Sequence, residues 1–182
     1  MAAPATAPLT RDRIVSAALS LTKAAGEPPS MRTLAGELSV TPGALYRHVA
    51  GQADLVALMI DEVMEHVEMP DEATEPDPWR RIRAHVHSLT KTLDAYPGLD
   101  RLIAHHGDSS NAARVRQQWT MDQLRTAGLN RRDAGRAYGA LDIYWLGSRQ
   151  RTQRSVATFL FGLDRLLEGL RAHSRNSSAT SG

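Results

Sequence analysis

The chain has 182 residues, of which 42% are hydrophobic, so it can bury a core in one large domain or in a small domain joined to a larger one. It has no cysteine, which excludes disulfides and thiolate metal sites and agrees with a reducing, cytoplasmic location. The net charge is only +2, no stretch approaches the roughly 18 apolar residues of a membrane span, and the start, MAAPATAPLTRDR, lacks the pattern of a secretion signal, so we expect no membrane partner.

Apolar residues recur at helical spacing along the chain, and no run of β-branched residues alternates with polar ones over strand length. We therefore expect an all-α protein. The expected segments are a flexible arm over residues 1–9, three short helices over 10–50, a connecting helix over 51–68, an acidic linker over 69–78, a helical C-terminal domain over 79–172 and a disordered tail over 173–182.

Capping residues predict the ends of the first three helices. Gly26 is a stop for the first helix, and Ser30 can cap a second helix that runs to about Leu38. Thr41 can cap the third helix by accepting from free backbone N–H groups, which is worth about 1 kcal/mol. Pro42 suits the first helical position, where its missing donor would be unpaired anyway.

The C-terminal domain should contain five further helices, which start near Pro78, Leu99, Ser109, Asn130 and Ser155. The last of these is expected to end at about residue 171. In the helix that ends before Gly128, the residues expected on one apolar face are Val115, Trp119 and Leu124. The spacing of Asn130 and Asp133 resembles a capping box.

The segment TPGALYRHV, residues 41–49, combines a helix start with successive polar and aromatic side chains. With the two helices before it and a tight turn at Ser39 and Val40, it makes a helix-turn-helix, whose last helix enters the major groove of DNA. An ordinary helical hairpin, with Tyr46 packed and Arg47 solvated, is compatible with the same spacing.

On the DNA-binding interpretation, each side chain in the segment has a chemical role. Small residues at Gly43 or Ala44 would let the backbone approach DNA, Tyr46 and His48 can donate to phosphates, and Arg47 can reach a guanine edge or a phosphate. The candidate DNA-binding residues are Arg32, Thr33, Thr41, Pro42, Gly43, Ala44, Tyr46, Arg47, His48 and Gln52. Residues 1–50 carry five basic and three acidic side chains, so one such domain would hold DNA weakly and should act in a pair.

Residues 11–63, RDRIVSAALSLTKAAGEPPSMRTLAGELSVTPGALYRHVAGQADLVALMIDEV, resemble the DNA-binding domain of the TetR family of transcriptional repressors. The matching elements are Ile14 with Ala17-Ala18, the Gly26 turn, Met31 through Leu38, Val40, Ala44-Leu45-Tyr46, His48-Val49 and Leu55. The resemblance implies a helical homodimer that represses transcription and releases its palindromic operator when a small molecule binds the C-terminal domain. Family members often carry lysine just before the supporting helix, where this chain has Ala50-Gly51-Gln52.

An effector pocket is expected between the acidic linker and the last two helices. The candidate lining residues, each with a core or surface role as the alternative, are His87, His105, Trp119, Tyr144 and Trp145. From Trp79 onward there are seventeen basic residues and eight acids, which favours an anionic or polar effector. The last two helices are where the family dimerises, although they could instead close the chain's own core. The candidate interface residues are Leu141, Phe159, Leu160, Leu163 and Leu167.

Two other classes of function compete with this interpretation. An enzyme would have to use the histidines, but His85 and His87 are two apart on a helix and face different ways, and no His-Glu-x-x-His motif or phosphate loop occurs. We therefore expect no catalytic residue, metal or cofactor. The other alternative is a helical adaptor that binds protein rather than DNA through Tyr46, Arg47 and His48.

Overall fold

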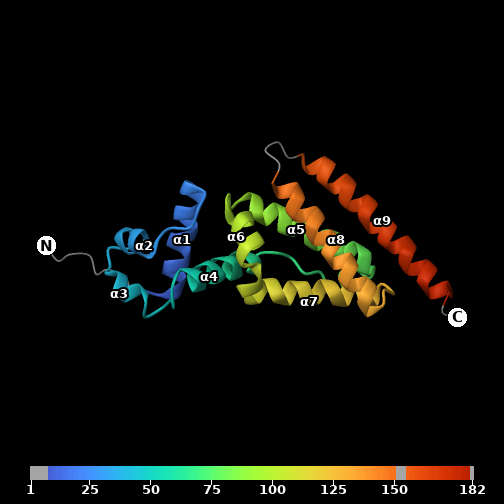
Figure 1. Ribbon diagram of the computed structural model, residues 1–182, viewed down its shortest axis with the longest axis horizontal. Helices are drawn as coiled ribbons and strands as arrows, with labels where there is room; N and C mark the ends of the chain where they lie inside the picture. Colours follow the sequence, from blue (N-terminus) through green and yellow to red (C-terminus); the bar gives the residue numbers. More distant parts are fainter. Residues whose placement is uncertain (1–7, 151–154, 181–182) are drawn as a thin grey trace. The chain divides into compact units, whose positions relative to one another are not determined.

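The computed structural model describes residues 8–150 and 155–180, and the secondary structure in these ranges is helical with no strand (Figure 1). This confirms the all-α prediction. The chain forms two compact units: the first contains the described residues up to Glu62 together with Tyr96–Ser110, and the second contains Val63–Ala95 and the residues from Asn111 onward. The grouping of residues 96–110 with the N-terminal helices was not predicted from the sequence. No helix in the described ranges is long and apolar enough to cross a membrane.

The first unit begins with two helices whose ends follow from the predicted caps. α1 spans Arg11–Ala25, and its N-cap Thr10 accepts a hydrogen bond from a backbone N–H three residues on. It ends at Gly26, which has the left-handed conformation at φ 78°. α2 spans Met31–Glu37, and the hydroxyl of its N-cap Ser30 accepts in the same way at 3.1 Å.

The third helix is shorter than expected, because α3 spans only Pro42–Leu45. Thr41 occupies the N-cap position, but its hydroxyl makes no capping hydrogen bond, so that part of the prediction is wrong. The physical reason is that the Ala44 N–H donates instead to the main-chain carbonyl of Thr41, at 2.9 Å. The turn before α3 is tight, as predicted, and places Ser39 at φ 54°, a left-handed conformation that is rare for a residue with a side chain.

Two more helices complete the first unit. α4 spans Gln52–Glu65, and its last three residues already belong to the second unit. α6 spans Leu99–His106 and is followed by a 3₁₀ turn, η1, over Gly107–Ser109. Beyond this turn the buried Ser110 hydroxyl donates to the Asp61 carboxylate at 2.7 Å, which ties the end of the α6 segment to α4. The buried apolar core of the unit consists of Ile14, Val15, Ala18, Leu19, Met31, Leu34, Ala35, Leu45, Val49, Leu55, Val56, Met59, Ile60, Leu99 and Leu102.

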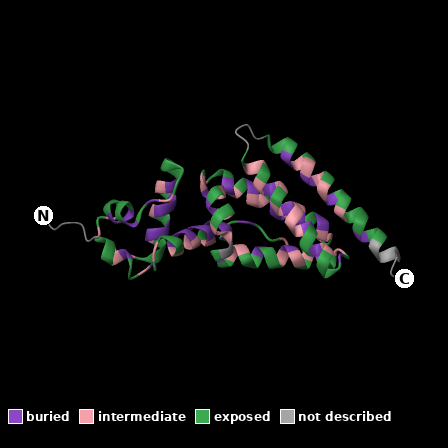
Figure 2. Ribbon diagram, viewed as in Figure 1, coloured by how far each residue is buried: buried purple, intermediate pink, exposed green. Residues whose placement is uncertain are grey.

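The second unit contains four longer helices. α5 spans Pro78–Asp94, α7 spans Asn111–Thr126, α8 spans Arg131–Arg149 and α9 spans Val156–Thr180. α5 packs against α7 and α9, and α8 packs against the same two helices. On α9 the buried residues recur on one face, as Figure 2 shows, and they include Phe159, Leu163 and Leu167.

Polar caps begin two helices of the second unit, and the one at Asn130 was predicted. The Asp77 carboxylate accepts from the Trp79 N–H at 2.9 Å and starts α5. The Asn130 side chain accepts from the Asp133 N–H at 2.9 Å and donates to the Asp133 carboxylate at 2.8 Å, which confirms a capping pair at the start of α8.

The second unit differs from the sequence expectations in two places. Val115 is 49% exposed, because the buried face of α7 is formed by Arg116, Thr120 and Leu124. The tail expected to be disordered from residue 173 continues as helix to Thr180. A polar contact holds this end of the helix, since the buried Ser174 hydroxyl donates to the Ala127 carbonyl at 2.6 Å.

Candidate nucleic-acid interface and effector site

Most residues predicted to bind DNA are exposed, and they lie on α2, on α3 and in the segment that follows α3. Tyr46 is 54% exposed and Arg47 is exposed beside it, so neither forms part of the core. The same short segment is held in place by Leu45 and Val49, which are 0% and 2% exposed. Burial of these two residues, four positions apart, thus presents the tyrosine and the arginine outward.

Gly43 has no structural neighbour that requires a glycine. A Cβ built on it would meet only the Thr41 hydroxyl, at 4.0 Å, and its φ is not in the left-handed region. The space beside it is open, so the backbone of α3 is accessible to a partner at this point. Pro42 and Thr41 are also exposed, while Ala44 is half-buried.

α2 contributes two more candidates at its first turn. Arg32 and Thr33 are both exposed. The Thr33 hydroxyl shares a hydrogen bond of 2.8 Å with the hydroxyl of Ser30, the N-cap of the helix. Arg32 carries a positive charge with no close partner in the described part of the chain, so it is available to a phosphate.

Two candidates have structural partners that sequence reasoning missed. The Gln52 side chain donates to the Pro29 carbonyl at 3.0 Å, so its N–H₂ group holds α4 to the loop before α2. His48 is half-buried, and its main-chain carbonyl accepts from the Arg11 guanidinium at 3.3 Å. Arg11 therefore lies next to the α3 segment, although no sequence pattern had marked it.

The predicted effector residues do not form one cluster. His87 and His105 are exposed, so neither lines an interior site. His105 belongs to the first unit, where its Nδ1 contacts the Arg101 carbonyl at 2.7 Å. The other four candidates lie in the second unit.

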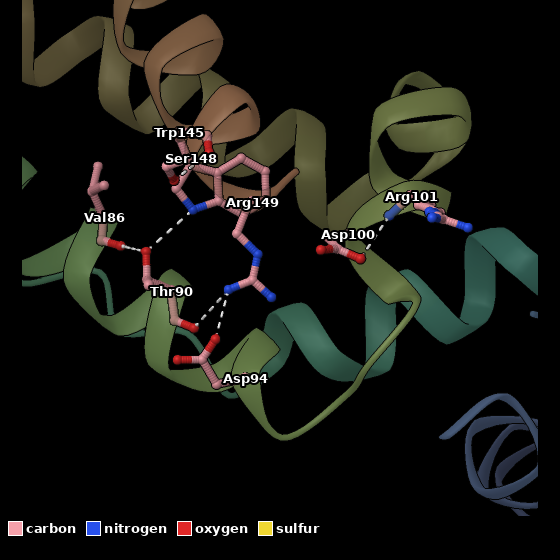
Figure 3. Close-up of polar contacts among 8 residues, drawn as sticks. All are labelled: Val86, Thr90, Asp94, Asp100, Arg101, Trp145, Ser148 and Arg149. Carbon is pink, nitrogen blue, oxygen red and sulfur yellow. Dashed lines mark hydrogen bonds and ion pairs between the residues drawn. The ribbon is translucent and has the colours of Figure 1, made fainter. Parts of the chain in front are cut away.

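Tyr144 and Trp145 already have structural partners within the second unit. The Tyr144 hydroxyl donates to the Phe159 carbonyl at 2.8 Å, and a Cβ at Gly162 would sit 2.1 Å from the same hydroxyl oxygen. Figure 3 shows the buried Trp145 donating through Nε1 to the Thr90 hydroxyl, at 3.2 Å. Both side chains therefore hold α8 to its neighbours.

A buried polar group between α5 and α7 was not predicted. His85 is 4% exposed, its Nδ1 lies 2.7 Å from the Glu68 carbonyl, and its ring meets that of Trp119 at a centroid distance of 4.9 Å. Because a carbonyl oxygen can only accept, Nδ1 carries the proton and Nε2 is an acceptor. Burial lowers the pKa of His85 to about 4, with the charge of Arg116 acting in the same direction, so the ring is neutral at pH 7.

Arg116 is the second member of this group and is 8% exposed. One terminal nitrogen donates to the Val67 carbonyl at 3.0 Å, and Nε is buried with no hydrogen-bond partner. Burial lowers the pKa of Arg116, while the exposed carboxylate of Glu65 acts in the opposite direction. Sequence periodicity missed this residue because it assigns an arginine to the solvent face.

Most residues predicted for the dimer interface are buried within the single chain. Leu141, Phe159, Leu163 and Leu167 are at most 6% exposed, and Leu160 is half-buried. Within the single chain they close the packing of α8 and α9 on the second unit's own core. The large apolar residues that do face outward on these helices include Ile143, which is 74% exposed, and Phe161, which is 67% exposed.

Small residues surround Ile143 on the outer side of α8. Gly135 and Gly147 are exposed, Gly139 is half-buried, and a Cβ on any of them would meet nothing within 4 Å.

Within the described ranges, no three His, Asp or Glu side chains group in a way that could hold a metal ion.

No protein-family profile matches the chain. An HTH-type transcriptional regulator of Saccharopolyspora erythraea is 33% identical over 142 residues, which are 77% of this chain. The chain spans 59% of the length of that curated relative.

Two solved proteins resemble the structure along nearly all of its length. The TetR family protein ActR of Streptomyces coelicolor, in complex with (S)-DNPA, has a TM-score of 0.79 and 26% identity, with 92% of this chain and 100% of that chain covered. BioQ of Mycobacterium smegmatis has a TM-score of 0.81 and 26% identity, with 91% and 99% covered. A further structure holds BioQ with its double-stranded DNA operator, at a TM-score of 0.79 and 27% identity, with 91% and 100% covered.

Proposed function

Because the chain belongs to the TetR family of transcriptional regulators, we propose that it binds a palindromic operator as a homodimer, represses transcription there and releases the DNA when a small-molecule effector binds. The observation that carries the proposal is the outward presentation of Tyr46 and Arg47 on a segment anchored by Leu45 and Val49. The cytoplasmic location expected from the sequence would give such a protein access to its operator.

In this proposal, residues 41–49, which we call the reading segment, make both sequence-specific and non-specific contacts with DNA. Arg47 reads a guanine edge in the major groove, and Tyr46 donates to a phosphate. Open space beside Gly43 supports a close approach of the α3 backbone to the duplex. Arg32 and Thr33 hold the phosphates that flank the groove, from the exposed first turn of α2.

Tight DNA binding in this proposal needs the DNA-binding domains of two chains, because the net positive charge of one domain is small. Five basic and three acidic residues in the first fifty give a net charge of 5 − 3 = +2, which leaves little electrostatic affinity for a polyanion. A twofold-symmetric pair doubles the phosphate contacts and matches the symmetry of a palindrome, with half-sites about one helical turn apart or a multiple of it.

The dimer surface that we propose lies on the outer faces of α8 and α9 and is centred on Ile143 and Phe161. Both side chains are more than half exposed, and they are large enough to supply an apolar centre. The open space beside Gly135, Gly139 and Gly147 lets a second helix approach α8 closely. This surface replaces the buried leucines expected from the sequence.

Release by an effector requires a connection between the two units, and α4 is a covalent one. The helix starts in the first unit and ends in the second. The α6 segment supplies a further connection, since the chain enters and leaves it from the second unit while Ser110 binds Asp61 of α4. We propose that an effector moves α4 and so changes the spacing of the two reading segments.

Selection of duplexes from a random pool by the purified protein tests this function. An enriched palindrome, with affinity that falls steeply as salt rises, is the expected result. A pool that stays random at low salt would contradict DNA binding and favour the adaptor interpretation.

A further inference from the structure

We propose, on the basis of the function proposed above, that the effector is an aromatic organic acid whose carboxylate is bound by Arg116 inside the second unit, with Thr120, His85 and Trp119 completing the site. The four side chains come from two neighbouring helices, α5 and α7, which pack against each other.

The first support is the incomplete hydrogen bonding of Arg116, whose charge is opposed by the exposed carboxylate of Glu65 but makes no ion pair among the described residues. The side chain is 8% exposed, its Nε is buried without a hydrogen-bond partner, and among the described residues its one hydrogen bond goes to the neutral carbonyl of Val67. Arginine is almost never buried unless its charge is paired. A guanidinium with open donor positions is the group that best matches a carboxylate, which it can bind through two parallel hydrogen bonds.

The second support is the composition of the α7 face that carries the arginine. Thr120 is four residues further on, so it lies on the same side of the helix, and it is 5% exposed. The buried threonines of the other helices, Thr22 and Thr90, each donate to the carbonyl four residues earlier, but the Thr120 hydroxyl makes no such bond. Its donor is therefore available to a second oxygen of the same anion.

The third support is the pair of rings beside these donors, which indicates the rest of the ligand. Trp119 lies between Arg116 and Thr120 in sequence, is half-buried and contacts the His85 ring. An indole face favours a flat apolar ring attached to the carboxylate. The Nε2 of His85 is an acceptor, because Nδ1 donates to the Glu68 carbonyl, and it can accept from a hydroxyl on such a ligand.

The side chains of this site favour an aromatic carboxylate over other classes of effector. A cationic ligand would meet the like charge of Arg116 and no buried carboxylate among the residues named above. A purely apolar ligand would leave the guanidinium unpaired, which is unfavourable in a buried site. An aromatic carboxylate satisfies the guanidinium, the hydroxyl and the indole together.

Isothermal titration of the full chain with 2-naphthoate and with its neutral isostere 2-naphthamide tests the inference. We expect the wild-type protein to bind the carboxylate at least about tenfold more tightly than the amide, because a hydrogen bond to a charged group is worth that factor or more. Equal affinity for the two probes, or binding of neither, would overturn it.

Two substitutions at one position and one control assign the preference to Arg116. Arg116→Met should bring the two affinities within about twofold, and Arg116→Lys should keep part of the preference for the carboxylate, because it retains the charge without the planar fork. Arg114→Met, at an exposed arginine on the same helix, should leave the preference unchanged. A preference that survives in Arg116→Met, or one that is undiminished in Arg116→Lys, would overturn the inference, and the second outcome applies even if only the lysine variant folds.

Operator binding is measured in parallel on the same proteins. A failure of the proposed function can then be distinguished from a failure of the inference about the effector. Wild-type protein and Arg116→Met should bind the selected duplex equally when no probe is present. If the duplex is bound but the carboxylate is not preferred, the inference about the effector is wrong and the regulatory function stands. If no duplex is selected, the proposed function is wrong whatever the probe does.

Discussion

Gly98 and Gly26 meet through their backbones inside the first unit: a Cβ added to Gly98 would lie 2.6 Å from the Gly26 carbonyl oxygen. Gly98 is the N-cap of α6 and Gly26 ends α1, so the contact joins the start of α6 directly to the loop between α1 and α2. Gly98 also has φ 90°, a conformation that favours glycine. Both its backbone angle and its neighbour therefore exclude a side chain.

Gly98→Ala should consequently destabilise the protein by about 1–3 kcal/mol, from the left-handed strain and the clash with main-chain atoms. Gly36→Ala is the matched control, because Gly36 lies within α2 with nothing near its Cβ position, and alanine should there stabilise by about 0.5–1 kcal/mol. Urea unfolding of both variants gives the two values. A stable Gly98→Ala protein would contradict the close contact.

Gly43 should respond differently from Gly98. Gly43→Leu should change the free energy of unfolding by less than about 0.5 kcal/mol, because the added side chain enters open space. The same variant should lose operator affinity by tenfold or more on our proposal, since the leucine would separate α3 from the duplex. Unfolding curves and fluorescence anisotropy with the selected duplex measure the two effects, and unchanged affinity would show that α3 does not approach DNA at Gly43.

Tyr46 tests the phosphate contacts. Removal of its hydroxyl in Tyr46→Phe should weaken binding to all duplex sequences about equally, because a phosphate contact carries no sequence information. Arg132→Ala, at an exposed arginine on α8, should leave all affinities unchanged. Competition between the operator and an unrelated duplex measures the effect. A loss confined to the operator would place Tyr46 at a base instead.

His85 gives the stability a dependence on pH. Its pKa in the folded protein is about 4, below the ordinary histidine value of 6.5, so the unfolded chain binds more protons between these values. The stabilisation from the neutral ring is complete above pH 6.5 and is lost as the pH falls toward 4, by roughly 3 kcal/mol at most from 1.36 kcal/mol per unit. Urea unfolding at pH 7 and at pH 5 should show the loss, and His85→Gln should remove most of this difference. An equal slope in both proteins would assign the pH dependence to other groups.

Ile143 tests the proposed dimer surface. Ile143→Asp puts a charge at the centre of an apolar contact and should convert the dimer to a monomer with an unchanged helical spectrum. Val115→Asp, at an exposed apolar residue of α7, is the control and should leave the dimer intact. Sedimentation equilibrium distinguishes the two states. A dimer that survives the first change would place the interface elsewhere.

The parts of the fold that were predictable depend on local chemistry. Gly26, Ser30 and Asn130 were recognised as helix ends because their capping interactions involve residues only a few positions away. The orientation of the α3 segment was predictable for a similar reason, since Leu45 and Val49 are four apart and bury the same side of the turn.

The residues that were misplaced depend on contacts distant in sequence. The buried face of α7 carries Arg116 and Thr120, so apolar periodicity selected Val115 instead. His85 and His87 differ by two positions on one helix, and which of them faces inward is decided by packing against α7. Likewise, the apolar residues at helical spacing on α8 and α9 predict a buried face. They do not distinguish burial in the chain's own core from burial against a second copy.

The most direct test of the regulatory proposal is the affinity of wild-type protein and Arg47→Ala for the selected operator and for a set of single base-pair changes in it. We predict that Arg47→Ala weakens binding to the operator by about 1–3 kcal/mol. On duplexes in which one particular guanine of a half-site has been replaced, the variant and the wild type should bind equally. The same guanine position should be found in each half-site. An arginine variant that binds every duplex as the wild type does, with the same order of preference, would contradict the assignment of this segment to the DNA groove.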